Sequence, residues 1–115
     1  MSRRGTSGKE PWLADLDPGI RDYVEILSNQ GIETFESCQG GPGHAYPEPT
    51  VRFHGQPGEG PRALGVCIDH GLPVQCLRRV WDLLNSNEPT GPHWELVFWP
   101  SSVLRARAKR MMAGR

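Results

Sequence analysis

The segment from Ser37 to Gly55, SCQGGPGHAYPEPTVRFHG, limits the folds open to this chain more than any other stretch. It joins two apolar runs, and its prolines Pro42, Pro47 and Pro49 can neither continue a helix nor donate to a sheet ladder. About twelve residues connect IETFESC to TVRFHG, which is too long for a two-residue hairpin turn. We therefore predict two strands joined by a structured loop.

Apolar residues at helical spacing predict three helices in the rest of the chain. The first covers residues 18–30, after the helix-starting pair Asp17-Pro18. A short helix over 61–70 and a longer one over 73–85 follow. The last of these would bury one stripe, made of Leu77, Val80, Trp81 and Leu84.

Alternation of apolar and polar residues in HWELVFW, residues 93–99, predicts a third strand. The expected element order is therefore α-β-β-α-α-β. This order is typical of an α+β fold with a small, mostly antiparallel sheet of about three strands and helices packed on one face.

The length of 115 residues and the 37% content of hydrophobic residues fit a single domain. We expect a flexible basic segment over residues 1–12, one α+β domain over 13–100, and a basic segment over 101–115. The last segment could be helical, with a weak apolar stripe of Leu104, Ala108, Met111 and Met112.

The net charge of zero hides an uneven distribution of charge along the chain. Residues 1–10 and 101–115 together carry +7, whereas residues 11–100 carry −7. An acidic domain disfavours nucleic-acid binding except through the basic ends. The three cysteines lack CxxC spacing, and no apolar run is long enough to span a bilayer, so we expect a cytoplasmic protein without a membrane partner.

The alternation of side chains along strands sorts the polar residues onto one face of the expected sheet. We expect Phe35, Val51 and Phe53 to face the core. The opposite face would then gather Glu36, Arg52, His54, His93, Glu95 and Trp99. Such a face is either an ordinary water-facing surface, on which Arg52 pairs with a carboxylate across the strands, or a shallow site where Arg52 meets an anion and Trp99 covers a ring.

Gly40, Gly41 and Gly43 follow directly after a strand, as glycines do in phosphate-binding loops. The specific nucleotide-binding signatures are absent, because no GK[ST] follows and prolines replace the expected helix. The glycines could form an irregular anion-binding loop, or they could only permit the backbone conformation of the loop. Tyr46 could pin the loop or stack on a flat ligand.

Cys38 could act as a nucleophile with His44 or His54 as its base, or fill a small apolar space at a strand end. A zinc site could use Cys38 with the two histidines, or Cys67 with His70. The sequence contains neither CxxC nor HExxH. We therefore assign no catalytic residue, metal or cofactor.

The run GIETFESCQGGPGHAYPEPTVRFHG, preceded by a helix and followed by WELVFW, resembles small uncharacterised proteins encoded by tailed phages and prophages. The resemblance covers about residues 18–99, and the specific part is the core Gly-h-x-Thr-x-x-Ser-Cys-x-Gly, where h is a hydrophobic residue. It implies an accessory protein that binds a host component, including nucleotide signals of host defence.

From these features we expect a protein that binds a small anionic or nucleotide-like ligand without turnover. Two alternatives stay open, an inhibitor that binds a host protein and a small hydrolase or transferase that uses Cys38 or a metal. Association of the chain with further copies of itself is a third alternative. The candidate ligand-binding residues are Glu36, Ser37, Cys38, Gly40, Gly41, Gly43, His44, Tyr46, Arg52, His54 and Trp99.

Overall fold

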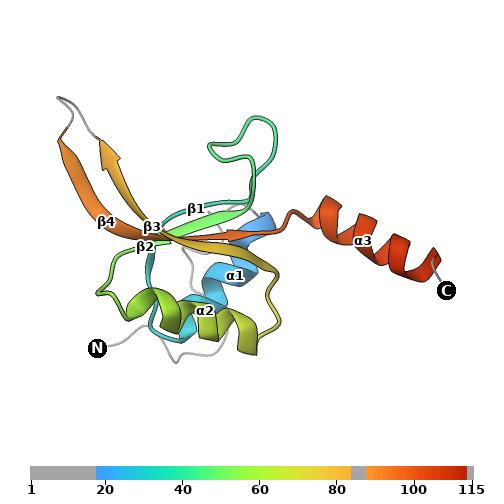
Figure 1. The fold of residues 1–115 in the computed structure, drawn as a ribbon, viewed down its shortest axis with the longest axis horizontal. Helices are drawn as coiled ribbons and strands as arrows, with labels where there is room; N and C mark the ends of the chain where they lie inside the picture. The colour runs from blue at the N-terminus through green and yellow to red at the C-terminus, as the bar shows by residue number, and fades with distance from the viewer. Residues whose placement is uncertain (1–17, 84–87, 114–115) are drawn as a thin grey trace.

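The computed structural model describes residues 18–83 and 88–113 and has an α+β fold with one four-stranded sheet. Its elements follow the order α-β-β-α-β-β-α (Figure 1). They are α1 (Pro18–Asn29), β1 (Thr34–Cys38), β2 (Thr50–Phe53), α2 (Glu59–Asp69), β3 (Val74–Leu83), β4 (Pro89–Phe98) and α3 (Ser101–Ala113). The predicted class is confirmed, whereas the predicted number of about three strands is wrong.

The sheet has the strand order β1-β2-β4-β3, and all three pairings are antiparallel. Helices α1 and α2 lie side by side on one face of this sheet, which we call the helix face (Figure 1). The opposite face, which carries Arg52 and Glu95, is called the open face. The hydrophobic core lies between the sheet and the two helices.

Helix α1 forms where the apolar stripe predicts it. Ile20, Val24 and Leu27 recur at helical spacing, and each is buried against the sheet. The helix ends before Gly31, which adopts a positive φ of 83° that suits glycine after a last turn. The predicted helix over 18–30 is therefore confirmed to within one residue.

Helix α2 approaches the sheet closely because its first turn contains a glycine. A Cβ atom at Gly60 would overlap the indole ring of Trp94 on β4. Ala63 and Cys67 continue the same side of the helix and are fully buried. The sequence placed this helix at 61–70, close to its observed position at Glu59–Asp69.

The predicted helix over residues 73–85 is wrong, because this segment forms strand β3. It pairs with β4 from Val74 to Leu83 and builds a long hairpin that projects beyond the rest of the sheet (Figure 1). The expected buried stripe also fails, since the Trp81 side chain is 59% exposed. Only Leu77 of that stripe packs on the core, and Leu84 lies outside the described residues.

Phe35 does not face the core as the alternation predicted. A β-bulge between Thr34 and Glu36 breaks the alternation of β1, so Phe35 is 44% exposed and stacks on the ring of His54. A bulge lets two successive side chains point to the same side of a sheet. Glu36 remains on the open face, opposite Arg52 in the strand register.

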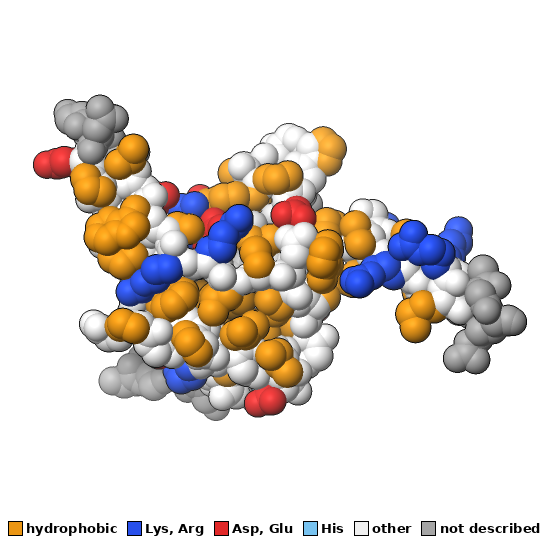
Figure 2. All heavy atoms as spheres, viewed as in Figure 1, with side chains coloured by type: hydrophobic (Ala, Val, Ile, Leu, Met, Phe, Trp, Pro, Cys, Tyr) orange, Lys and Arg blue, Asp and Glu red, His pale blue; other side chains and the backbone are white. Residues whose placement is uncertain are grey.

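The C-terminal segment is helical over Ser101–Ala113 and projects away from the sheet (Figure 1). Figure 2 shows lysine and arginine side chains gathered on this helix. The basic segment expected over residues 1–12 lies outside the described residues. Among the helices in the described ranges, none combines the length and the apolar character needed to cross a bilayer.

Candidate functional site

The loop over residues 39–49 is held in one shape by its own hydrogen bonds. The N–H of Gly41 donates to the carbonyl of Pro47 at 3.0 Å, which closes the loop across its base. Gly40 has a positive φ of 82°, and a Cβ atom there would overlap the backbone of Glu48 and Pro49. Glycine at position 40 is therefore required both by the backbone angle and by the close approach of the returning chain.

Two further hydrogen bonds fix the end of β4, one to this loop and one to the residue that precedes β3. The N–H of Phe98 donates to the carbonyl of Pro49 at 2.8 Å, and the N–H of Trp99 donates to the carbonyl of Pro73 at 2.8 Å. The chain then turns at Pro100 into α3. The loop, the end of β4 and the start of α3 are therefore neighbours in space.

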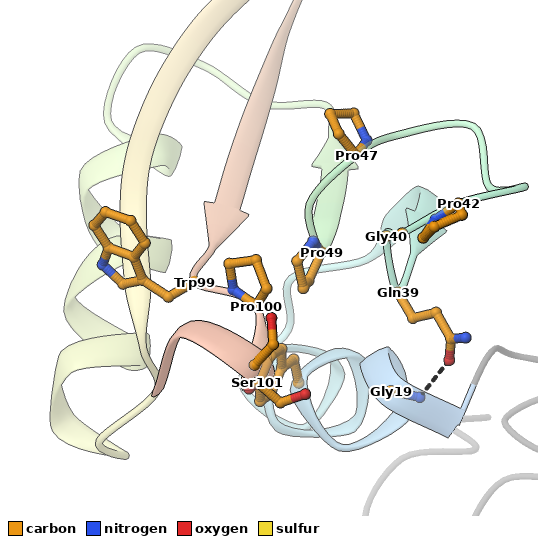
Figure 3. Close-up of a pocket in the computed structure, with 12 residues that line it drawn as sticks. Gly19, Gln39, Gly40, Pro42, Pro47, Pro49, Trp99, Pro100 and Ser101 are labelled. Carbon is orange, nitrogen blue, oxygen red and sulfur yellow. Dashed lines mark hydrogen bonds between the residues drawn. The ribbon is translucent and has the colours of Figure 1, made fainter. Parts of the chain in front are cut away.

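A cavity of about 530 Å³ lies where this loop meets the starts of α1 and α3 (Figure 3). This volume falls in the range of pockets that bind small molecules. Its described lining comes from four separate segments of the chain. The lining residues are Gly19, Tyr23, Gln39, Gly40, Gly41, Pro42, Pro47, Pro49, Trp99, Pro100, Ser101 and Ser102.

The polar donors of the cavity come from the first turns of two helices. The N–H of Gly19 in α1 donates to Oε1 of Gln39 at 2.9 Å, so an acceptor already occupies this helix start (Figure 3). In α3 the intrahelical hydrogen bonds begin with Val103 and Leu104, which both donate to the carbonyl of Pro100. Ser101 and Ser102 precede them, so their N–H groups belong to the first turn that no helical carbonyl satisfies.

Both helix starts therefore bring partial positive charge to the cavity. The aligned peptide dipoles of a helix are equivalent to about half a positive charge at its N-terminus. The hydroxyl groups of Ser101 and Ser102 add further donors beside the α3 backbone. This arrangement is suited to a negatively charged ligand.

The apolar walls of the cavity are prolines and two aromatic residues. Tyr23 packs on Phe98, with ring centroids 4.5 Å apart, and burial raises the pKa of its hydroxyl, helped by the nearby Asp22 carboxylate. The ring of Trp99 turns away from the loop prolines (Figure 3). Its partner is Arg107 of α3, whose guanidinium carbon lies 5.3 Å from the ring centroid.

The open face carries a network of charges centred on Arg52. Its Nε donates to Glu95 at 3.0 Å, and its Nη1 donates to both oxygens of Asp82, at 3.0 and 2.9 Å. Arg78 binds the other oxygen of Glu95 at 2.7 Å. Burial by itself would lower the pKa of Arg52, but these hydrogen bonds outweigh it and raise the pKa above its ordinary value. Arg52 is therefore already neutralised by carboxylates of its own chain.

Aromatic rings surround this network on the open face. Phe35, His54 and His93 contact one another with centroid distances between 4.3 and 5.1 Å. The Tyr46 hydroxyl donates to Glu36 at 2.9 Å. Burial, followed by this hydrogen bond, raises the pKa of Tyr46 to about 12. The ring thus pins the loop to the sheet, which is one of the two roles predicted for it.

The structure divides the predicted site residues between these two places. Gly40, Gly41 and Trp99 line the cavity, although Trp99 follows the end of β4 and is not part of the strand. Four others lie on the open face: Glu36, Tyr46, Arg52 and His54. The remaining four are Ser37 and Cys38 at the end of β1, exposed Gly43, and exposed His44, which contacts Gln39.

Sequence reasoning missed the helix starts that line the cavity. Gly19 follows Asp17-Pro18, which was recognised as a helix start, but nothing local shows that it approaches the glycine-rich loop. The pair Ser101-Ser102 after Pro100 is also a recognisable helix start. Their meeting at one cavity depends on the tertiary fold, which neither local signal contains.

Cys38 is 5% exposed, and its Sγ accepts a weak hydrogen bond from the N–H of Gly40 at 3.4 Å. The two histidines considered as its base have contacts elsewhere, His44 with Gln39 and His54 with Phe35. Across the described ranges, no group of three or more histidine, cysteine or acidic side chains is placed to hold a metal ion.

Comparisons of the chain with models of known protein families, with curated proteins and with solved structures found no match.

Proposed function

We propose that the protein binds a small anionic, nucleotide-like ligand in the cavity between the 39–49 loop, α1 and α3. The observation that carries this proposal is that the first turn of α3, with the N–H groups and hydroxyls of Ser101 and Ser102, faces a cavity of about 530 Å³. The start of α1 lies at the same cavity, although Gln39 already accepts from its Gly19 N–H. The N–H groups and hydroxyls of Ser101 and Ser102 would hold the anionic group. The prolines and Tyr23 offer apolar surface for a ring.

The chemistry of the lining supports binding without turnover. None of the described lining residues is a cysteine, histidine, carboxylate, lysine or arginine. The serines Ser101 and Ser102 do line the cavity, but a serine hydroxyl acts as a nucleophile only beside a general base, and these absent side chains are the usual bases. A ligand held there is positioned by neutral donors and apolar contacts and is released unchanged. Such a sequestering role agrees with the accessory function implied by the resemblance to phage proteins.

Calorimetric titration with a panel of nucleotides and cyclic nucleotides tests the proposal, with Ser101→Asp as the decisive variant. The new carboxylate would repel an anion while favouring the helix start, so the fold should persist. We expect affinity to fall at least about tenfold, or about 1.4 kcal/mol. Ser101→Asn, which is neutral and of similar shape, should bind within about threefold of the parent. Absence of heat with the whole panel, or equal loss in both variants, would refute the proposal.

A second variant distinguishes the cavity from the open face as the place of binding. Arg52→Ala removes the central cation of the open face but leaves every lining residue of the cavity in place. We expect it to bind ligand as the parent does. If Arg52→Ala lost binding and Ser101→Asp kept it, the ligand-binding site would lie on the open face and not in the cavity.

Binding to another protein is the second candidate function, and the projecting β3–β4 hairpin favours it. Trp81 and Leu83 on this hairpin are 59% and 67% exposed, although both are large apolar side chains. Exposed apolar groups of this kind are common in protein interfaces. The double variant Trp81→Ser, Leu83→Ser should lose any protein captured from host extract by the parent, and equal capture by both would dismiss the hairpin as the contact.

A further inference from the structure

Helix α3 extends from the domain without a packing partner in the described part of the chain. No helix or strand there packs extensively along it, and residues 105–111 are all exposed. Its contact with the domain includes Arg107 on the Trp99 ring, at the junction with β4. The helix has 13 residues, a length at which an isolated helix is marginal in water. It therefore has the properties of an element that docks on another molecule.

The charge of α3 complements the charge of the domain that carries it. The helix has four basic residues and no acidic one, namely Arg105, Arg107, Lys109 and Arg110. The described residues before it, 18–83 and 88–100, contain ten carboxylates and five arginines, a net charge of −5. The basic helix and the domain of net negative charge thus belong to the same chain, and α3 projects away from that domain (Figure 1).

The helix also has an apolar stripe, of which the monomer half-buries Leu104 and leaves Ala108 and Met111 exposed to water. Leu104, Ala108 and Met111 recur at a spacing of four and three residues, so they share one face. Met111 is 74% exposed. Burial of such a stripe adds a contribution that is independent of salt, whereas the basic residues add one that salt weakens.

We propose that α3 docks on the acidic domain of a second copy of this chain and that the reciprocal contact closes a dimer. Each copy supplies one basic helix and one acidic domain, so a twofold arrangement satisfies both at once. A partner made of nucleic acid is disfavoured, because the −5 domain directly attached to the helix would repel the phosphates. A net charge of zero removes the overall repulsion between two copies.

Sedimentation velocity and light scattering on the full chain test this proposal. At about 0.01 M salt, where charges act over about 30 Å, we expect a species of twice the 12.8 kDa chain mass. At about 1 M salt, where this range falls to about 3 Å, the dissociation constant should rise about tenfold or more. A monomer at low salt up to about millimolar concentration would overturn the proposal.

The decisive variant reverses the charge of the helix with Arg105→Glu, Arg107→Glu, Lys109→Glu and Arg110→Glu. It should be monomeric, whereas the matched control Arg105→Lys, Arg107→Lys, Arg110→Lys keeps the charge and should dimerise. Circular dichroism establishes that both variants are folded. A dimer that survives charge reversal would overturn the proposal, as would a monomeric parent chain that binds duplex DNA or anionic vesicles through α3.

Discussion

The open face of the sheet and the loop cavity differ in where their polar groups find partners. On the open face, Arg52, Glu95 and Asp82 bind one another, and Glu95 is almost fully buried. At the cavity, the donors of Ser101 and Ser102 come from a helix start, and no described lining side chain carries a charge. The comparison teaches that the charged residues of the open face pair with one another within the sheet, whereas the lining of the loop cavity consists of neutral residues whose helix-start donors face the cavity.

The largest effect should follow from breaking the charge network. Arg52→Ala leaves the Glu95 carboxylate, whose side chain is 4% exposed, with Arg78 as its only remaining cation in the network. Loss of one partner of a buried ion pair costs about 3 kcal/mol of unfolding free energy. Urea denaturation measures this loss. Arg78→Ala is the control, since its side chain is 57% exposed and should cost about 1 kcal/mol or less. Equal costs for the two variants would contradict the central role of Arg52.

The conformation of the 39–49 loop, which forms one wall of the cavity, is best tested by substituting glycines of that loop. Gly40→Ala combines an unfavourable φ with overlap of the Glu48 and Pro49 backbone, so we expect a loss of at least about 2 kcal/mol. Gly43→Ala has a similar φ of 83° but open space around the new methyl group, and should cost about 1 kcal/mol. Thermal unfolding compares the two. If they are equally stable, the close approach at Gly40 does not shape the cavity.

Tyr46 connects the two regions, and its removal should have a smaller, pH-dependent effect. Tyr46→Phe loses the hydrogen bond to Glu36 and should cost about 1 kcal/mol at neutral pH. The folded chain holds the Tyr46 proton up to a pKa of about 12, whereas an unfolded tyrosine loses it near pH 10. Stability should therefore fall as pH rises from about 10 to about 12, and less steeply in Tyr46→Phe. Urea denaturation between about pH 9 and about pH 12 measures the unfolding free energy of both proteins. If it fell equally with pH in the parent chain and in Tyr46→Phe, the Tyr46 hydroxyl would not be the group responsible.

The smallest structural perturbation is a thiol label, which compares the exposure of the cysteines on β1, α2 and β3. Cys76 is half-buried and should react first in the folded protein, followed slowly by Cys38, which is 5% exposed. Cys67 should stay unlabelled until unfolding, because it is fully buried and burial raises the pKa of its thiol to about 11. Mass spectrometry of labelled peptides gives the order. Labelling of Cys38 ahead of Cys76 would favour the alternative of a reactive nucleophile.

Local patterns predicted the parts of the fold that local interactions determine. Helix α1 and helix α2 follow from apolar stripes, and the outward placement of Arg52 and Glu36 follows from the alternation of strands. Strand β3 was mistaken for a helix because Leu77, Val80 and Trp81 also fit a helical stripe. Its identity depends on pairing with β4, which no local pattern contains.

The same limit applies to the candidate site. The sequence placed Gly40 and Gly41 in a candidate binding loop, and both line the cavity. The sequence also placed Arg52 in the same ligand site as these glycines, whereas the structure pairs Arg52 with Asp82 and Glu95 on the open face. These partners are 30 and 43 residues from Arg52, so spacing alone could not identify them. Phe35 was misplaced for a different reason, since the bulge at Thr34 and Glu36 has no sequence signal in this strand.

The strand order also determines when this protein can fold during synthesis. The central pair of the sheet joins Thr50 to Val97 and Phe53 to Trp94, more than forty residues apart. Such distant pairings slow folding, because a long stretch of chain must be closed before the contacts form. In a nascent chain that ends before β4, strand β2 lacks the strand with which it pairs at the centre of the sheet. The side chains of Val51 and Phe53 then cannot be fully buried, because the core also contains residues of β4. We therefore expect the N-terminal half to complete its folding only after β4 has left the ribosome. A chain that terminates before β4 should lose the fold, whereas a chain that lacks only α3 should keep the sheet.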